Sequence, residues 1–142
     1  MDKRIEEILP RVQKPARYTG GEYGSTMKDK SQVDVRFAFC FPDTYEIGMS
    51  NLGMRILVGC LNQMDGVYCQ RSYAPWPDME AQLLQNDLPL YALETGEPLC
   101  NFDALLFTLQ YELCYTNVLN MIRLSGLPMY AKDRTGEMPL II

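Results

Sequence analysis

The sequence predicts an α/β fold, a three-layer Rossmann-like or flavodoxin-like domain with a mostly parallel sheet. Two stretches, residues 33–41 and 103–109, become continuously apolar, a pattern typical of strands buried on both faces of a parallel sheet. Between such stretches, apolar side chains recur at helical spacing. Buried strands that alternate with amphipathic helices imply parallel strands joined by right-handed crossovers, with helices on both faces of the sheet.

The first half of the chain supplies a short helix, a strand and a longer helix. The short helix is expected to end before Pro10, which follows an i, i+3, i+4 stripe of apolar residues. The strand at 33–41 ends at Pro42-Asp43. The longer helix is expected from about Ser50, the predicted N-cap, to residue 65. Its predicted apolar face comprises Met54, Leu57, Val58, Leu61 and Met64.

The second half continues the alternation. Trp76-Pro77 opens a predicted helix, and a further helix is expected over about 116–125, closed by Gly126 and Pro128. The inward side chains expected on the first of these helices are Met79, Leu83 and Leu84. Four short apolar stretches are predicted to be strands: residues 67–69, 89–93, 103–109 and 139–142.

Composition divides the chain into two parts. Residues 1–32 are expected to form a helix and an extended basic arm, because residues 10–32 contain several glycines and five Lys and Arg. Residues 33–142 are expected to form the Rossmann-like domain. Ile142 lies inside an apolar run, so we expect this domain to be truncated at its C-terminus.

The net charge of −5 is unevenly distributed. Residues 1–36 carry eight Lys and Arg against six Asp and Glu, whereas residues 37–142 carry five against twelve. An acidic body is a poor surface for nucleic acid, so direct nucleic-acid binding is not expected. No apolar run reaches the 18 residues of a membrane span, and the charged N-terminus lacks a signal peptide. These features predict a cytoplasmic protein without a membrane partner.

The sequence contains no histidine. This excludes a Ser/His/Asp triad, a Cys/His pair and any metal site built on imidazole. The five cysteines include no C-x-x-C motif, so they are expected to be reduced, mostly buried thiols. An enzyme made of this chain alone would depend on carboxylates, Tyr, Lys or Cys.

Two polar loops follow the predicted central strands, at residues 42–53 and 108–117. In open parallel sheets, ligands bind beyond the carboxyl ends of the strands. The same residue types also cap helices, so a capping role stays open for each of them. Neither G-x-G-x-x-G nor a P-loop is present. The candidate site residues are Asp43, Tyr45, Glu46, Gly48, Ser50, Asn51, Gly53, Thr108, Gln110, Glu112, Tyr115, Thr116 and Asn117.

Asp43, Tyr45 and Gly48 form a D-x-Y-x-x-G pattern. This resembles the D-x-H-x-x-G loop of cobalamin-binding domains, with Tyr45 at the position of the histidine that ligates cobalt. The wider sequence is similar to the N-terminal region of an uncharacterised family of radical S-adenosylmethionine (radical SAM) proteins, whose members begin with a cobalamin-binding-like domain. Four blocks carry that resemblance: residues 13–22, 41–53, 73–80 and 109–121.

The resemblance implies a division of chemistry within the protein. In the family, a later C-x-x-x-C-x-x-C motif binds a [4Fe–4S] cluster, which acts with S-adenosylmethionine. This sequence lacks the motif, so cluster and S-adenosylmethionine would belong to a C-terminal radical SAM domain, the expected partner. Cobalamin would bind here without a histidine ligand, because a neutral phenol such as Tyr45, whose pKa is ordinarily near 10, is a poor ligand for cobalt.

Three functional hypotheses follow. The first is a cofactor-binding-like, cobalamin-type domain of a radical SAM iron–sulfur enzyme of unknown substrate, not catalytic by itself. The second is a non-catalytic scaffold with a Rossmann-like fold that docks a partner domain. The third is a self-sufficient hydrolase that uses Asp43, Glu46 and Glu112 as acid and base. Fold alone does not decide among them.

Overall fold

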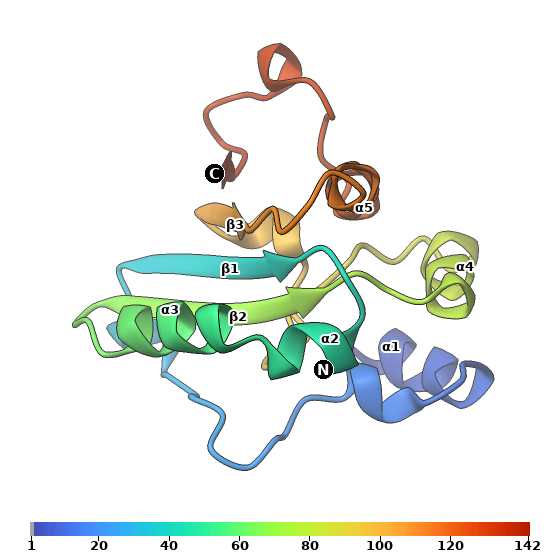
Figure 1. Cartoon of the computed structure of the whole chain (residues 1–142), viewed down its shortest axis with the longest axis horizontal. Coiled ribbons are helices and arrows are strands. Elements are labelled where there is room, and N and C mark those ends of the chain that lie inside the picture. Colours follow the sequence, from blue (N-terminus) through green and yellow to red (C-terminus); the bar gives the residue numbers. More distant parts are fainter. Residues whose placement is uncertain (1) are drawn as a thin grey trace.

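The computed structural model describes residues 2–142 and confirms the α/β fold class (Figure 1). Four strands form one all-parallel sheet in the order β2-β1-β3-β4. The strand order reverses at β1, since β2 lies on one side of it and β3 on the other. The strands are β1 (Val35–Phe41), β2 (Val67–Tyr73), β3 (Ala104–Phe107) and β4 (Leu140–Ile141).

Five α-helices and five short 3-10 turns complete the fold. The α-helices are α1 (Lys3–Ile8), α2 (Tyr45–Ser50), α3 (Leu52–Asn62), α4 (Pro77–Gln85) and α5 (Cys114–Leu124). The 3-10 turns are η1 (Leu9–Arg11), η2 (Pro15–Tyr18), η3 (Lys30–Gln32), η4 (Leu99–Asn101) and η5 (Ala131–Asp133).

The central strand β1 is buried on both faces because its alternate side chains enter two different cores. Ala38 and Cys40 join the first core, which helices α1, α4 and α5 cover. Phe39 and Phe41 join the second core, which helices α2 and α3 cover. The predicted arrangement of helices on both faces of a parallel sheet is therefore confirmed.

The N-terminal arm lies against the body of the protein. The Arg17 guanidinium is 2.8 Å from a Glu46 carboxylate oxygen on α2. Farther along, the Lys28 ammonium donates to the carbonyl of Val67 at 2.6 Å, and Tyr68 donates to the carbonyl of Thr26 at 3.1 Å. The arm thus runs from α2 to the start of the outer strand β2, as the lower loop of Figure 1 shows.

The strand predicted at residues 89–93 is wrong. A strand would pair with one neighbouring strand, but three of its backbone amides donate to carbonyls in three different segments. Leu90 donates to Leu124, Ala92 to Glu97 and Leu93 to Arg71. Pro89 has no amide hydrogen to donate. The segment is apolar because it is buried in the core, and apolarity alone does not distinguish a buried strand from a buried irregular segment.

The helix predicted from Ser50 is instead two helices, α2 and α3. Ser50 ends α2, and its hydroxyl donates to the carbonyls of Glu46 and Ile47. Asn51 is the N-cap of α3, with its side chain accepting from the amide of Met54 at 2.9 Å. The N-cap prediction was therefore wrong by one residue, and the polar segment before it is helical rather than a loop.

Several predicted core positions are exposed. On α3, Met54, Val58 and Leu61 contact the second core, whereas Leu57 is exposed, as is Met64 just beyond the end of the helix. On α4, Leu84 is likewise exposed. Each helix contacts the sheet along a narrower stripe than its apolar sequence predicts. All five cysteines are unpaired, and Cys60 is exposed.

Candidate functional site

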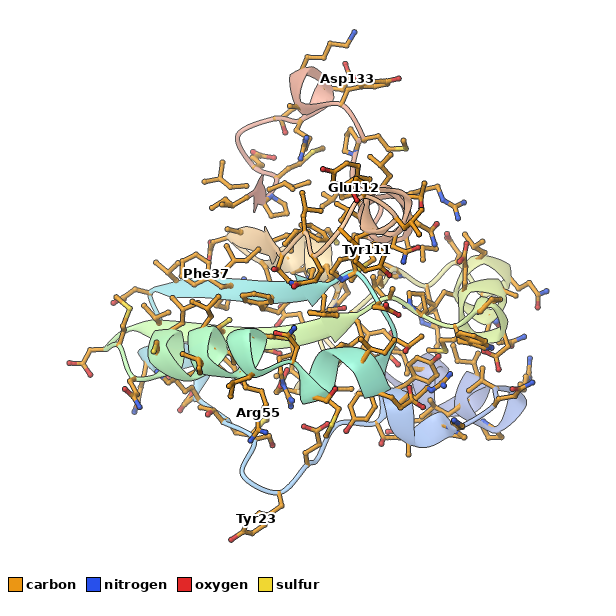
Figure 2. All side chains as sticks on the ribbon, viewed as in Figure 1. Tyr23, Phe37, Arg55, Tyr111, Glu112 and Asp133 are labelled. Atoms are coloured by element: carbon orange, nitrogen blue, oxygen red, sulfur yellow. The ribbon has the colours of Figure 1, made fainter. Side chains whose placement is uncertain are left out.

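The loops that follow β1 and β3 meet at the carboxyl edge of the sheet. The side-chain amide of Asn117, on α5, donates to the carbonyl of Pro42 at 2.9 Å. Electrostatic interaction with Cys114 and Asp43 raises the pKa of Tyr111. Figure 2 shows Tyr111 and Glu112 on the segment between β3 and α5, with the carboxyl end of β1 below that segment in this view. The segment that follows β3 is thus bonded to the loop that follows β1.

The loop between β3 and α5 is open to solvent. Thr108 and Gln110 bond to each other at 2.6 Å. Within residues 2–142, Glu112 forms no ion pair. Large apolar side chains on this loop and the exposed side of α5 are also uncovered: Leu109, Tyr111, Leu113, Tyr115 and Leu119. We call this set the carboxyl-edge patch. Leu113 is 78% exposed, the most open of the five.

The loop after β1 is held by internal bonds. The Asp43 carboxylate accepts a hydrogen bond from the backbone amide of Thr44 at 2.7 Å. The backbone carbonyl of Asp43 accepts one from the backbone amide of Ala74 at 3.0 Å. These bonds are those of a turn that ends one strand and starts a helix. The charge of Asp43 also contributes to the raised pKa of Tyr111, on the second loop.

Tyr45, at the position that histidine takes in the cobalamin-binding loop, is turned toward the arm. Its hydroxyl donates to the Glu22 carboxylate, and its ring lies edge-on to Tyr73 at 5.3 Å between centroids. Burial, together with the bond to Glu22, raises the pKa of Tyr45 to about 12. Tyr45 therefore stays a neutral phenol at physiological pH, and its oxygen is already bonded.

Glu46 also faces the arm. Arg17 and Lys14 approach the same carboxylate oxygen, at 2.8 and 3.3 Å. The hydrogen bond from Arg17 lowers the pKa of Glu46 to about 2. Glu46 is thus ionised and paired with two cations of the arm, so a role as general acid or base would first require that this pairing be broken.

The remaining candidates of this loop shape the α2–α3 corner. A Cβ on Gly48 would lie 2.4 Å from the Tyr73 ring, so only glycine fits there. Asn51 caps α3, and Gly53 follows it in the first turn of that helix. Ser50 closes α2. The contacts of Gly48, Ser50 and Asn51 therefore stabilise the end of α2 and the start of α3.

The structure thus divides the thirteen candidates into two groups. One group contacts the arm or shapes the α2–α3 corner: Tyr45, Glu46, Gly48, Ser50, Asn51 and Gly53. The other group lies at the carboxyl edge: Asp43, Thr108, Gln110, Glu112, Tyr115, Thr116 and Asn117. The carboxyl edge, and not the D-x-Y-x-x-G pattern, is the candidate site.

Sequence reasoning missed a buried charge group beside the arm. Arg71, on β2, contacts Glu22 and Glu94, each at 2.6 Å. Its side chain is 14% exposed and that of Glu94 5%. The available signal was a charged residue in the middle of an otherwise buried strand, where a charge must be paired.

Searches for metal sites and membrane spans gave no candidate in the described part of the chain. Residues 2–142 hold no group of three His, Cys, Asp or Glu side chains arranged to bind a metal ion. Over the same residues, no helix has the length and apolarity needed to span a membrane.

Comparison with known proteins gives one match. Neither the curated proteins nor the solved structures match the chain. Residues 53–142, well over half of the chain, match the family described as "Radical SAM proteins, N-terminal". The match includes β2, β3, β4 and the whole carboxyl-edge patch. The chain therefore belongs to the family of N-terminal domains of radical SAM proteins.

Proposed function

We propose that this chain is the non-catalytic N-terminal domain of a radical SAM iron–sulfur enzyme, and that its carboxyl edge forms one wall of the enzyme's reaction cleft. The catalytic domain, which would hold the [4Fe–4S] cluster and S-adenosylmethionine, forms the opposite wall. Family membership supports the partner, because the family is defined as the N-terminal part of radical SAM proteins.

The carboxyl-edge patch carries this proposal. Five large apolar side chains on one loop and the first half of one helix are each exposed over a large part of their surface. Exposed apolar clusters of this kind mark sites of contact with another surface. Asp43, Gln110 and Glu112 lie among them or at their border, and they supply polar groups that would orient a bound molecule.

A photo-crosslinking experiment tests this wall. A photoreactive phenylalanine analogue replaces Leu113 in the full-length radical SAM protein, with Tyr23→(photoreactive residue) as the control, because Tyr23 is fully exposed at the tip of the arm. We expect a crosslink from position 113 to a peptide of the catalytic domain and none from position 23. Absence of a crosslink from 113, with a folded protein, would remove the docking role.

Cobalamin is a second candidate for the same edge. The patch offers an apolar surface on which the flat corrin ring of a cobalamin would lie. The patch follows the carboxyl end of β3, and ligands of open parallel sheets bind beyond the carboxyl ends of the strands. The residues do not fit protein ligation of cobalt, since the chain has no histidine and the Tyr45 oxygen is bonded to Glu22. Any cobalamin here would be held through its ring and side groups alone.

Titration of the full-length protein with hydroxocobalamin tests that candidate by the change in its visible spectrum. Binding is expected to weaken at least tenfold in Leu113→Glu and to be unchanged in Tyr45→Phe. The electron paramagnetic resonance spectrum of the bound cobalt(II) form is likewise expected to be the same in Tyr45→Phe. A spectrum altered by that substitution would mean that Tyr45 ligates cobalt.

A further inference from the structure

A groove lies between the arm and helix α3, beside the outer strand β2. Its volume is about 510 Å³, within the range of about 300–1,000 Å³ that is usual for small-molecule sites. Residues 22–26 of the arm form one wall, and Arg55, Val58 and Gly59 of α3 form the other. Figure 1 shows the arm and α3 on the β2 side of the sheet, and the strands β1 and β3 lie between β2 and β4.

Three charged side chains that line this groove carry one excess negative charge. Arg71 contacts the carboxylates of Glu22 and Glu94, each at 2.6 Å. Within residues 2–142, neither carboxylate has a second cation. The Tyr45 hydroxyl also donates to Glu22, but a neutral phenol does not offset a charge. The side chains of Glu22 and Glu94 are only 24% and 5% exposed, so a further cation would stabilise this group.

Arg55 is the fourth charged side chain that lines the groove. In the part of the chain that the structure describes, residues 2–142, it forms no ion pair. Figure 2 shows its side chain extending from α3 toward the arm. A guanidinium group in this state binds carboxylate oxygens well, because its donors match the two oxygens of a carboxylate. The groove thus presents an unpaired cation on one wall and a net negative group elsewhere.

Gly59 keeps the α3 wall of the groove open. It lies in the interior of the helix, where glycine is less favourable than alanine. A Cβ at this position would meet no atom within 4 Å, so packing within the described chain does not require glycine here. Gly59 follows Arg55 by four residues, and the two are therefore neighbours on one face of the helix. The missing side chain lets a molecule bound to Arg55 lie directly against the helix backbone.

We propose that this groove binds a zwitterionic small molecule of the amino-acid type. Its carboxylate would bind Arg55, its ammonium group would bind Glu22, and its body would lie over Gly59. A ligand with a negative charge alone would be repelled by the excess charge around Arg71, and one with a positive charge alone would leave Arg55 unpaired. This site lies on α3 and the arm, apart from the carboxyl-edge patch, and it does not rest on the function proposed above.

Titration of the full-length protein with the standard L-amino acids tests the proposal. Isothermal titration calorimetry at millimolar concentrations is expected to find at least one amino acid that binds. Its N-acetyl and amide derivatives each remove one of the two charges, and each should bind roughly tenfold more weakly. If no amino acid binds, or if both derivatives bind as well as the parent compound, the groove is not a site for zwitterions and the proposal is wrong.

Substitutions on α3 locate the bound molecule. Arg55→Gln removes the cation and Gly59→Ala fills the open wall, so each should weaken binding roughly tenfold, although Gly59→Ala is expected to stabilise the helix. Arg11→Gln is the matched control. Arg11 is also exposed and without an ion pair in residues 2–142, but it lies outside the groove. Binding that survives both groove substitutions would place the amino acid elsewhere and overturn the proposal.

Limited digestion with trypsin distinguishes a ligand site from an internal ion pair. If Arg55 closed onto Glu22 in solution, the groove would keep no free charge for a ligand. Arg55→Gln would then loosen the arm and speed its cleavage after Arg17 or Lys28. We expect the rate of cleavage in the arm, measured without ligand by mass spectrometry, to be the same in Arg55→Gln as in the wild type. Faster cleavage in this variant would show that Arg55 already pairs with the arm, against the proposal.

Discussion

The loops after β1 and β3 lie side by side at the same edge of the sheet, but they differ in how they are held. In the first, Tyr45 and Glu46 bond to the arm, and the glycine at 48 fits against Tyr73. In the second, the apolar side chains are exposed, and the one carboxylate, Glu112, forms no ion pair within residues 2–142. The first loop therefore stabilises the fold, whereas the second is free to bind. Neighbouring position alone does not make two loops one site.

The largest effect is expected where the first loop is most closely packed. Gly48→Ala would place a methyl group 2.4 Å from the Tyr73 ring, and overpacking of this kind costs about 1–3 kcal/mol of the free energy of unfolding. Gly59→Ala is the matched control, because a Cβ at Gly59 meets nothing within 4 Å. In a helix interior that exchange is expected to stabilise by roughly 0.5–1 kcal/mol. Urea denaturation measures both, and equal effects would contradict the comparison.

A smaller difference is expected between the helix starts that follow the two loops. Asn51→Ala removes the side chain that caps α3 at 2.9 Å and should cost about 1 kcal/mol. Thr116→Ala removes an exposed hydroxyl that donates to Leu113 at 3.4 Å, and it should change stability by less than about 0.5 kcal/mol. If Thr116→Ala were the more damaging variant in thermal unfolding, the second loop would be structural after all.

The smallest effect concerns pH. Arg17 lowers the pKa of Glu46 from its ordinary value of 4.5 to about 2. A carboxyl with a lowered pKa stabilises the fold above its unfolded value, and this contribution is lost as pH falls from about 4.5 through 2. Glu46→Gln should therefore reduce stability at pH 7 by less than about 1 kcal/mol, because the Glu46 side chain is 45% exposed and solvent screens its charge.

The matching control for that experiment is Glu112→Gln, which removes an unpaired carboxylate of the second loop. Denaturation curves for Glu46→Gln and wild type should converge near pH 2. A gap between them that is constant from pH 7 to pH 2 would show that the ion pair with Arg17 contributes nothing, and that the arm is held by its other contacts.

Local patterns in the sequence predicted much of this fold. The continuously apolar run around Ala38 and Cys40 correctly predicted a strand buried on both faces. The run at 89–93 was misread because apolarity reports burial and not hydrogen-bond partners. The stripe on α3 was overestimated, since the width of a buried stripe depends on what covers the helix, which Leu57 shows.

The candidate site was harder to predict than the fold. Arm and loop residues that bond to each other, such as Glu22 with Tyr45 and Arg71, are far apart in the chain, and no local pattern pairs them. A cap, an ion-pair partner and a ligand-binding group use the same side-chain types. Only the tertiary partner of each side chain distinguishes these roles. The polar composition of the first loop therefore could not reveal that Tyr45 and Glu46 are already bonded to the arm.

The arm has a consequence for how the chain folds as it is synthesised. The residues that bind the arm all come later in the sequence. Arg17 pairs with Glu46, 29 residues further on, and Glu22 pairs with Arg71, 49 residues further on. Lys30 pairs with Glu97, 67 residues further on. Although the arm leaves the ribosome first, it cannot dock before its partners on α2 and β2 have been synthesised. Until Val67 and Tyr68 have emerged, Lys28 and Thr26 have nothing to bind, so the first 32 residues of the nascent chain stay undocked while β1 is made.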